Sequence, residues 1–168
     1  LHNVYLITPY LTTTESVLRP NSAVNSAWAS NSPGNIDDPI FGYNINSGDN
    51  LTSDEAGADG ADVGGTANAT QTWGLTSVSK SYSEITEVTV VCLSRADDED
   101  IDHNVSMNIA GAGSVVKNID VGENDEYQWH SVSFSGSWVA ADFDNANISI
   151  ESNGESSFDY DVVYAVVD

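Results

Sequence analysis

The chain has 168 residues, 40% of them hydrophobic, and its 26 acidic residues face only 4 Lys or Arg, giving a formal net charge of −22. Its 4 Trp, 7 Tyr and 4 Phe exclude a disordered chain and indicate one folded domain. The charge argues against partners such as nucleic acid, whose recognition needs a basic stripe, and against an anionic membrane surface.

Such an acidic surface also constrains the solvent in which the protein works. Like charges at this density repel one another and oppose compaction at low salt. At about 1 M salt the Debye length falls to about 3 Å, so most of this repulsion is screened. The composition therefore predicts a high-salt environment, with an ordinary acidic secreted protein as the alternative.

Alternation with a period of two predicts antiparallel β-strands along the whole chain. The cleanest case is 103–110, where Val105, Met107 and Ile109 share one face. The predicted strands are 3–8, 16–19, 39–45, 70–75, 84–95, 103–110, 114–120, 126–134, 147–152 and 160–168. Turn residues between them are typical of a sandwich or barrel. One short helical turn is expected within 137–146, and a long acidic loop over 46–69.

The strand at 16–19 ends on Arg19, the only cation among the first 79 residues. Pro20 lacks a backbone donor, so ladder pairing is expected to end there. Guanidinium suits a bidentate carboxylate pair. We expect Arg19 to bind an acidic turn such as the one with Asp37 and Asp38, while Trp28 covers the sheet edge. The alternative is that Arg19 contacts a neighbouring subunit.

The segments 84–95 and 160–168 are apolar on both faces. Strands of this kind are either central in a sandwich or pressed against another subunit. The residues expected to serve structural or interface roles are Arg19, Trp28, Val91, Leu93, Val163 and Val167.

An acidic segment at 95–104 is the best candidate for a cation site. Its alternate positions carry Asp98, Asp100, Asp102 and Asn104. An EF-hand is excluded, because His103 stands where glycine is needed and Ile109 where a bidentate acid is needed. A cation site of irregular loop geometry, for Ca²⁺, Mg²⁺ or Na⁺, therefore stays a candidate in this segment or at Asp37 and Asp38. The alternative is a hydrated, salt-adapted loop. No other cofactor is expected.

The sequence carries no clear signature of a catalytic site. The single cysteine, Cys92, excludes an internal disulfide and lies in an apolar run, where a small buried side chain is expected. The three histidines fit no zinc motif, and no nucleophile elbow or phosphate loop occurs. With 26 acids, no carboxylate pair can be singled out. The protein is expected not to be an enzyme. No leader peptide or 18-residue apolar span is recognised either.

Four Asn-x-Ser/Thr sequons are candidate glycosylation sites. They are Asn50, Asn68, Asn104 and Asn147. Asn50 and Asn68 flank the long loop, where a glycan could be displayed. In a chain rich in Asn, Ser and Thr, chance occurrence is the alternative.

The order of several landmarks resembles a known module. They are "LRPNSAVNSAW", "IDDPIFGY", "TQTWGL", "ITEVTVVCLSRA", "YQWHSVSFSGSWVAADFDNANISIES" and "YDVVYAVVD". This order is similar to the jelly-roll β-sandwich of structural proteins of tailed viruses. The resemblance implies a jelly-roll domain over 15–168, preceded by an N-terminal strand or arm over 1–14.

With the acidic composition, the resemblance implies a virion protein of a tailed virus of a halophilic archaeon. Its role would be a capsid decoration or turret subunit, or a component of the tail exterior. Its partners would be further copies of itself, other virion proteins and host surface glycans.

A carbohydrate-binding or adhesion β-sandwich is the alternative function, because jelly rolls also carry such sites. An exposed aromatic platform would then stack on sugars. The candidates are Trp28, Trp73, Trp129 and Trp138, or several tyrosines. Assembly into a particle or ring at high salt favours the virion role, whereas a monomer retained on a glycan column favours sugar binding.

Overall fold

The computed structural model describes residues 16–25, 28–30, 63–64, 68–96, 102–121, 128–154 and 158–168. Within these ranges the chain is almost entirely β-strand, with one four-residue 3-10 helix, η2 (Ala140–Phe143). No helix in these ranges has the length and apolar character needed to cross a membrane. The predicted N-terminal arm over 1–14 and the strand predicted at 39–45 lie outside the described residues.

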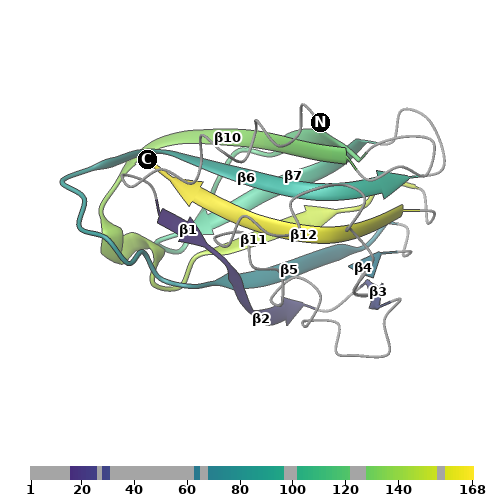
Figure 1. Cartoon of the computed structure of the whole chain (residues 1–168), viewed down its shortest axis with the longest axis horizontal. Coiled ribbons are helices and arrows are strands. Elements are labelled where there is room, and N and C mark those ends of the chain that lie inside the picture. The colour runs from purple at the N-terminus through teal and green to yellow at the C-terminus, as the bar shows by residue number, and fades with distance from the viewer. Residues whose placement is uncertain are drawn as a thin grey trace.

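Two antiparallel sheets pack face to face (Figure 1). Sheet A has the order β10-β6-β12-β4-β3, and β1 also pairs with β12. Its strands are β1 (Ser16–Leu18), β3 (Ala29–Ser30), β4 (Val63–Gly64), β6 (Ile85–Ala96), β10 (Gln128–Trp138) and β12 (Phe158–Val167). Long antiparallel registers join β6 to both β10 and β12.

Sheet B has the order β2-β5-β11-β7-β8, and β9 also pairs with β7. Its strands are β2 (Pro20–Asn25), β5 (Thr70–Leu75), β7 (Asp102–Ile109), β8 (Ala112–Gly113), β9 (Lys117–Asp120) and β11 (Asn147–Glu151). The two sheets confirm the predicted all-β antiparallel sandwich.

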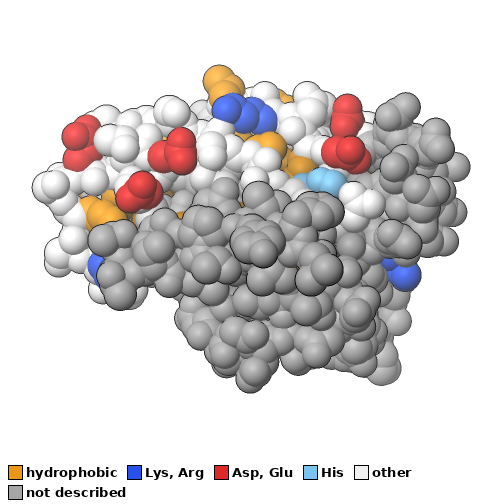
Figure 2. All heavy atoms as spheres, turned by 45° about the horizontal axis from the view of Figure 1, so that its top comes forward, with side chains coloured by type: hydrophobic (Ala, Val, Ile, Leu, Met, Phe, Trp, Pro, Cys, Tyr) orange, Lys and Arg blue, Asp and Glu red, His pale blue; other side chains and the backbone are white. Residues whose placement is uncertain are grey.

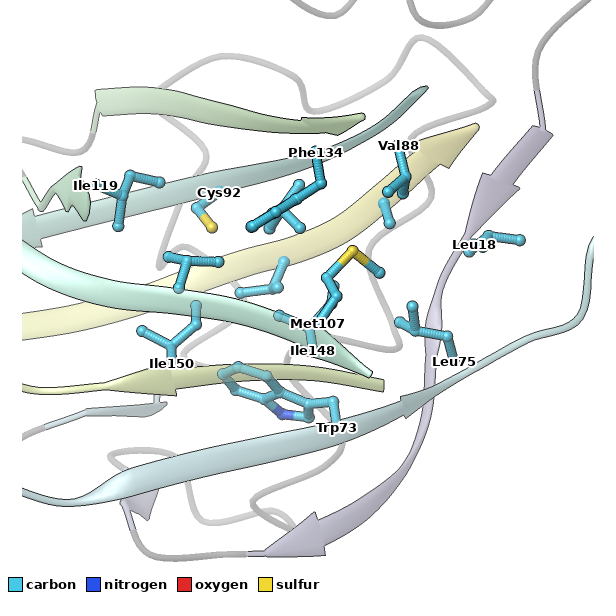
Figure 3. Close-up of a cluster of buried hydrophobic side chains, with 14 of the residues drawn as sticks. Leu18, Trp73, Leu75, Val88, Cys92, Met107, Ile119, Phe134, Ile148 and Ile150 are labelled. Atoms are coloured by element: carbon cyan, nitrogen blue, oxygen red, sulfur yellow. The ribbon is translucent and has the colours of Figure 1, made fainter. Parts of the chain in front are cut away.

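The core lies between the sheets and is built from the apolar positions of the alternating strands. Sheet B contributes Trp73, Met107 and Ile148, which face Val88 and other buried side chains of sheet A (Figure 3). Each of these side chains is at most 2% exposed. Because successive residues of a strand point to opposite faces, this inward set fixes which residues point out.

The chain passes from one sheet to the other at Arg19. Leu18 pairs with β12 in sheet A, whereas Pro20 pairs with Leu75 in sheet B. Pairing of this strand in sheet A ends before Pro20, as predicted, but Pro20 begins a new ladder in sheet B, which was not predicted. Proline is tolerated because it is the first residue of an edge strand.

The backbone of Arg19 is held at this crossing by Thr76. The Arg19 N–H donates to Thr76 Oγ1 at 3.0 Å, and the Thr76 N–H donates to the Arg19 carbonyl at 2.8 Å. One terminal guanidinium nitrogen is buried and makes no hydrogen bond to any residue in the described ranges. Asp37 and Asp38 lie outside the described residues, so the ion pair expected for Arg19 stays a prediction.

At the opposite edge of the sandwich, Lys117 of β9 joins the two sheets. Its Nζ donates to the carbonyl of Ser133 on β10. The same ammonium lies 5.5 Å from the ring centroid of Phe134. A lysine here also caps part of the edge strand β10, a position that would otherwise invite pairing with another chain.

The predicted helical turn within 137–146 is confirmed as η2, which buries Phe143. The loop predicted over 46–69 is interrupted by β4, which pairs with β12. This strand has only two residues, too few for a period of two to be recognised. The strands β2, β3 and β8 were likewise not predicted.

Candidate functional site

The outer face of sheet A is apolar and already buried. Val91 and Leu93 of β6 are fully buried, and Trp129 of β10 is only 4% exposed, yet none of the three belongs to the core cluster between the sheets. Tyr164 of β12 behaves in the same way, at 1%. This face therefore offers no accessible surface at these positions.

Val163 and Val167, which were expected to serve structural or interface roles, have a structural role. Val163 and Val167 belong to the core cluster between the sheets, where they are at most 1% exposed. Of the two placements expected for strands that are apolar on both faces, the central one is confirmed for β12, which is an inner strand of sheet A. Val91 and Leu93 face the other way but are equally inaccessible to a partner.

The outer face of sheet B is polar, and its outward residues on β5, β7 and β11 are half-buried or exposed except Thr72, which is only 8% exposed. On β7 the buried residues His103, Val105, Met107 and Ile109 alternate with outward residues of exposed or intermediate burial. β11 alternates in the same way, with Ile148 and Ile150 buried. The outward residues of β5, β11 and β7 are short hydroxyls, amides and a glycine, with acids only towards one end.

Cross-strand register brings five of these side chains together. Ser149 of β11 lies opposite both Thr72 of β5 and Ser106 of β7, and Asn147 lies opposite Asn108. Neighbouring strands are about 4.8 Å apart, so these side chains are direct neighbours. We name this set the amide–hydroxyl patch: Thr72, Ser106, Asn108, Asn147 and Ser149.

Hydrogen-bonding capacity in the patch is only partly used. Thr72 Oγ1 and Ser149 Oγ are 2.8 Å apart and share one hydrogen bond. The side chains of Ser106, Asn108 and Asn147 make no hydrogen bond within the described ranges. An amide offers two donors and an acceptor, and a hydroxyl offers both functions, so the patch presents several free groups of both kinds.

Beyond the patch, at one end of the face, the outward side chains are hydrogen-bonded to one another and include carboxylates. Asn104 Nδ2 donates to Glu151 Oε2 at 3.2 Å and to Asn153 Oδ1 at 3.4 Å. Asn118 Nδ2 donates to Asn104 Oδ1 at 3.1 Å. Asp102 lies opposite Asp120 at this end. The carboxylates of the described face are thus gathered at one end, away from the patch.

The tryptophans do not form the expected aromatic platform. Trp28 and Trp73 lie in the core, with ring centroids 5.8 Å apart in an edge-to-face arrangement. Trp129 is buried on the outer face of sheet A, and only Trp138 is half-buried. No aromatic side chain occupies an outward position of β5, β11 or β7.

The sequence led us to expect that Trp28 covers a sheet edge. In the structure it lies in the core instead. Its indole is 2% exposed and stacks on Tyr160 with centroids 5.1 Å apart. The Trp28 backbone N–H donates to Gln71 Oε1 at 3.1 Å, and its indole Nε1–H donates to the Ala69 carbonyl at 3.1 Å. These bonds draw Trp28 into the interior, where large aromatic side chains contribute most.

His103 is part of the same aromatic cluster and is fully buried. Its Nδ1 lies 3.0 Å from the Tyr160 hydroxyl, and its ring lies 4.5 Å from that of Phe158. Burial lowers the pKa of His103 to about 4, so the imidazole is neutral at pH 7. A neutral, enclosed imidazole of this kind is a packing residue rather than a surface ligand.

Only one of the five aspartates predicted as cation ligands lies within the described residues. Asp102 is exposed on β7, whereas Asp37, Asp38, Asp98 and Asp100 lie outside the described residues. Across the ranges that the structure covers, no three His, Cys, Asp or Glu side chains are grouped as a metal site would need. A cation site in the acidic loops stays a prediction. Burial raises the pKa of the Cys92 thiol, which makes it inert.

Carboxylates are spread over the part of the described surface that faces the viewer in Figure 2, and cationic side chains appear at few positions there. Against this background an uncharged patch is distinctive. The sequence showed the alternation that places Ser106 and Asn108 outward. It could not show that Asn147, Ser149 and Thr72 lie beside them, because this depends on strand order.

No family model matches the chain, and no curated protein matches it either. Among solved structures, it is similar to the C-terminal CBM6 of a laminarinase from Zobellia galactanivorans, with 9% identity over 92% of this chain and 99% of that chain, at a TM-score of 0.47. It is also similar to a family 35 carbohydrate-binding module from an environmental isolate, with 16% identity, 90% and 91% coverage and a TM-score of 0.41.

A third similar structure is the Podospora anserina GH26-CBM35 β-(1,4)-mannanase, with 12% identity and a TM-score of 0.47. There the likeness covers 91% of this chain but 27% of that chain.

The predicted role as a virion structural protein is corrected by these comparisons. The three similar structures described above are a CBM6, a family 35 carbohydrate-binding module and a mannanase that contains a CBM35, and none of these three is a viral structural protein. The landmark order that resembled the viral module consists of short motifs, each of which a β-sandwich of another function can also carry.

Proposed function

We propose that the protein is a non-enzymatic carbohydrate-binding β-sandwich, and that its binding surface is the amide–hydroxyl patch on the outer face of sheet B. The observation that carries the proposal is the clustering of five uncharged hydroxyl and amide side chains on three paired strands of a chain with net charge −22. A charge-free hydrogen-bonding surface is complementary to a ligand that is itself uncharged and rich in hydroxyls.

The chemistry of the patch supports this ligand class. Each sugar hydroxyl both donates and accepts a hydrogen bond, and the amides of Asn108 and Asn147 also do both. These groups stand on strands whose inward neighbours are buried in the core, so the backbone that carries them is in place before the ligand arrives. Glu151 and the facing Asp102 and Asp120 disfavour anionic glycans at the acidic end.

Binding is tested by native affinity electrophoresis in gels that contain soluble neutral polysaccharides, namely β-glucan, mannan, xylan or galactan. We expect at least one of them to retard the wild-type protein. Each of Asn108→Ala and Asn147→Ala should weaken binding about 2- to 10-fold, as expected for loss of a hydrogen bond worth about 0.5–1.5 kcal/mol. The double variant should bind too weakly to be retarded.

Ser135→Ala is the matched control, because Ser135 is an exposed polar residue on β10 of the other sheet. It should bind as the wild type does, and circular dichroism should show that all variants are folded. The proposal is wrong if no neutral polysaccharide retards the wild type, or if the double variant is retarded as strongly as the wild type.

A further inference from the structure

Three of the four sequons lie within the described residues, and their surroundings differ sharply. Asn68 is exposed and occupies a turn just before β5, with Thr70 as the first residue of that strand. Asn104 and Asn147 are half-buried on β7 and β11. An N-glycan is bulky and hydrophilic, so it needs an asparagine whose amide nitrogen opens to solvent in the folded protein.

The carboxamide of Asn68 is held in one orientation. Its Oδ1 accepts a hydrogen bond from the Gly154 N–H at 3.1 Å, and within the described ranges its Nδ2 makes no hydrogen bond. Because the carboxamide is planar, fixing Oδ1 also fixes the direction of Nδ2. The backbone has φ 50, in the left-handed region that asparagine tolerates better than most residues.

The middle residue of this sequon is anchored as well. The Ala69 N–H donates to Ser152 Oγ at 3.1 Å, and the Ser152 N–H donates to the Ala69 carbonyl at 3.0 Å. The turn is therefore tied to the segment that follows β11. A glycan on Asn68 would extend from a fixed point just before the first residue of β5.

The other two sequons are poor acceptors in the folded protein. Both Nδ2 hydrogens of Asn104 have acceptors, on Glu151 and Asn153. Glycosylation replaces one of these hydrogens and would place a sugar against Glu151. Asn147 stands on β11, which is flanked by β5 on one side and β7 on the other, so a sugar there would have to lie over the sheet.

We propose that Asn68 is the N-glycosylation site among these three sequons when the chain passes through a secretory route. In the transfer, Nδ2 of Asn68 forms a bond to the anomeric carbon of a lipid-linked oligosaccharide diphosphate. The bond between that carbon and the phosphate oxygen breaks, the lipid diphosphate leaves, and Nδ2 loses one proton. No oxidation or reduction takes place.

The test is secretion from yeast or insect cells, followed by peptide mass spectrometry of the folded fraction. We expect glycan mass on the Asn68 peptide and none on the Asn104 and Asn147 peptides. Asn68→Gln and Thr70→Val should each lose that glycan completely. Thr70→Val destroys the sequon but keeps the bond between Asn68 and Gly154, so it serves if Asn68→Gln does not fold.

Asn104→Gln and Asn147→Gln are the matched controls, and both should retain the glycan on Asn68. The proposal is overturned if the folded wild-type protein carries an unmodified Asn68, or if the glycan is found on Asn104 or Asn147 instead.

Discussion

His103 shows how a single titratable residue becomes part of the core. It is fully buried among Trp28, Phe158 and Tyr160, and burial lowers the pKa of its imidazole to about 4. In the unfolded chain the pKa of histidine is about 6.5. The folded state therefore disfavours the protonated form. The stability that the neutral form contributes is complete above pH 6.5 and is lost as the pH falls towards 4.

We expect His103→Gln to flatten this part of the pH dependence. The wild-type free energy of unfolding should fall between pH 7 and pH 4 by up to about 3 kcal/mol more than that of the variant. Urea denaturation at several pH values measures both. Burial also lowers the pKa of His130, while Asp120 acts in the opposite direction. His130→Gln is the comparison variant, because His130 is a second histidine with a lowered pKa, and equal pH slopes for wild type and His103→Gln would contradict the assignment.

Residue-scale predictions from the sequence succeeded where local pattern decides the outcome. The burial of Cys92 follows from its apolar neighbours and is confirmed. The position of Trp28 could not be predicted, because its burial depends on hydrogen bonds to Ala69 and Gln71, which are more than 40 residues away. Similarly, the hydrogen bond from the Arg19 N–H to Thr76 Oγ1 joins two residues that are 57 positions apart in the sequence.

Among the elements, β10 contains a bulge that depends on a glycine. The pairing of β10 with β6 shifts register between Ser135 and Trp138. A Cβ added at Gly136 would overlap the indole of Trp138, which folds back over this position. Trp138 in turn packs edge-to-face on Phe143 of η2 at 5.8 Å. The glycine thus allows the indole to close this end of the core.

We expect Gly136→Ala to displace the Trp138 indole and to destabilise the protein by about 1–3 kcal/mol, as overpacking does. Urea denaturation and the tryptophan emission spectrum measure these effects. Gly113→Ala is the matched control, because a Cβ at that position has no neighbour within 4 Å. If both variants were equally stable, Trp138 would not need the space above Gly136.

Element-scale prediction worked best for long alternating strands. The predicted ranges 70–75, 103–110 and 147–152 differ from β5, β7 and β11 by at most one residue at either end. β2 was missed because Pro20 reads locally as a strand terminator, although an edge strand accepts it as first residue. The predicted strand at 114–120 begins at Lys117, and Val115 and Val116 are exposed.

For the whole molecule, the net charge of −22 makes the solvent a determinant of stability. We propose a high-salt working environment and expect the melting temperature to rise by about 5 °C or more between 0.05 M and 1 M NaCl. For a domain of this size that rise corresponds to about 1–2 kcal/mol. Screening should saturate near 1 M, because the Debye length is then about 3 Å. A melting temperature independent of NaCl would contradict this proposal.

The amide–hydroxyl patch is also a property of the whole molecule, and this is why the sequence did not reveal it. Its members come from three strands that are far apart in sequence and adjacent only in sheet B. The alternation on β7 and β11 predicted polar outer faces, but polarity alone is what any solvated strand shows. Strand order and register were needed to assemble those residues into one surface.

The crossing at Arg19 has a mechanical consequence. Leu18 and Pro20 belong to different layers, so a continuous backbone fastens one corner of the sandwich. A single proteolytic cut between Leu18 and Arg19 would remove this covalent link and leave the two hydrogen bonds between Arg19 and Thr76 on the β2 side of the cut. β1 could then separate from β12 without displacing β2 from β5.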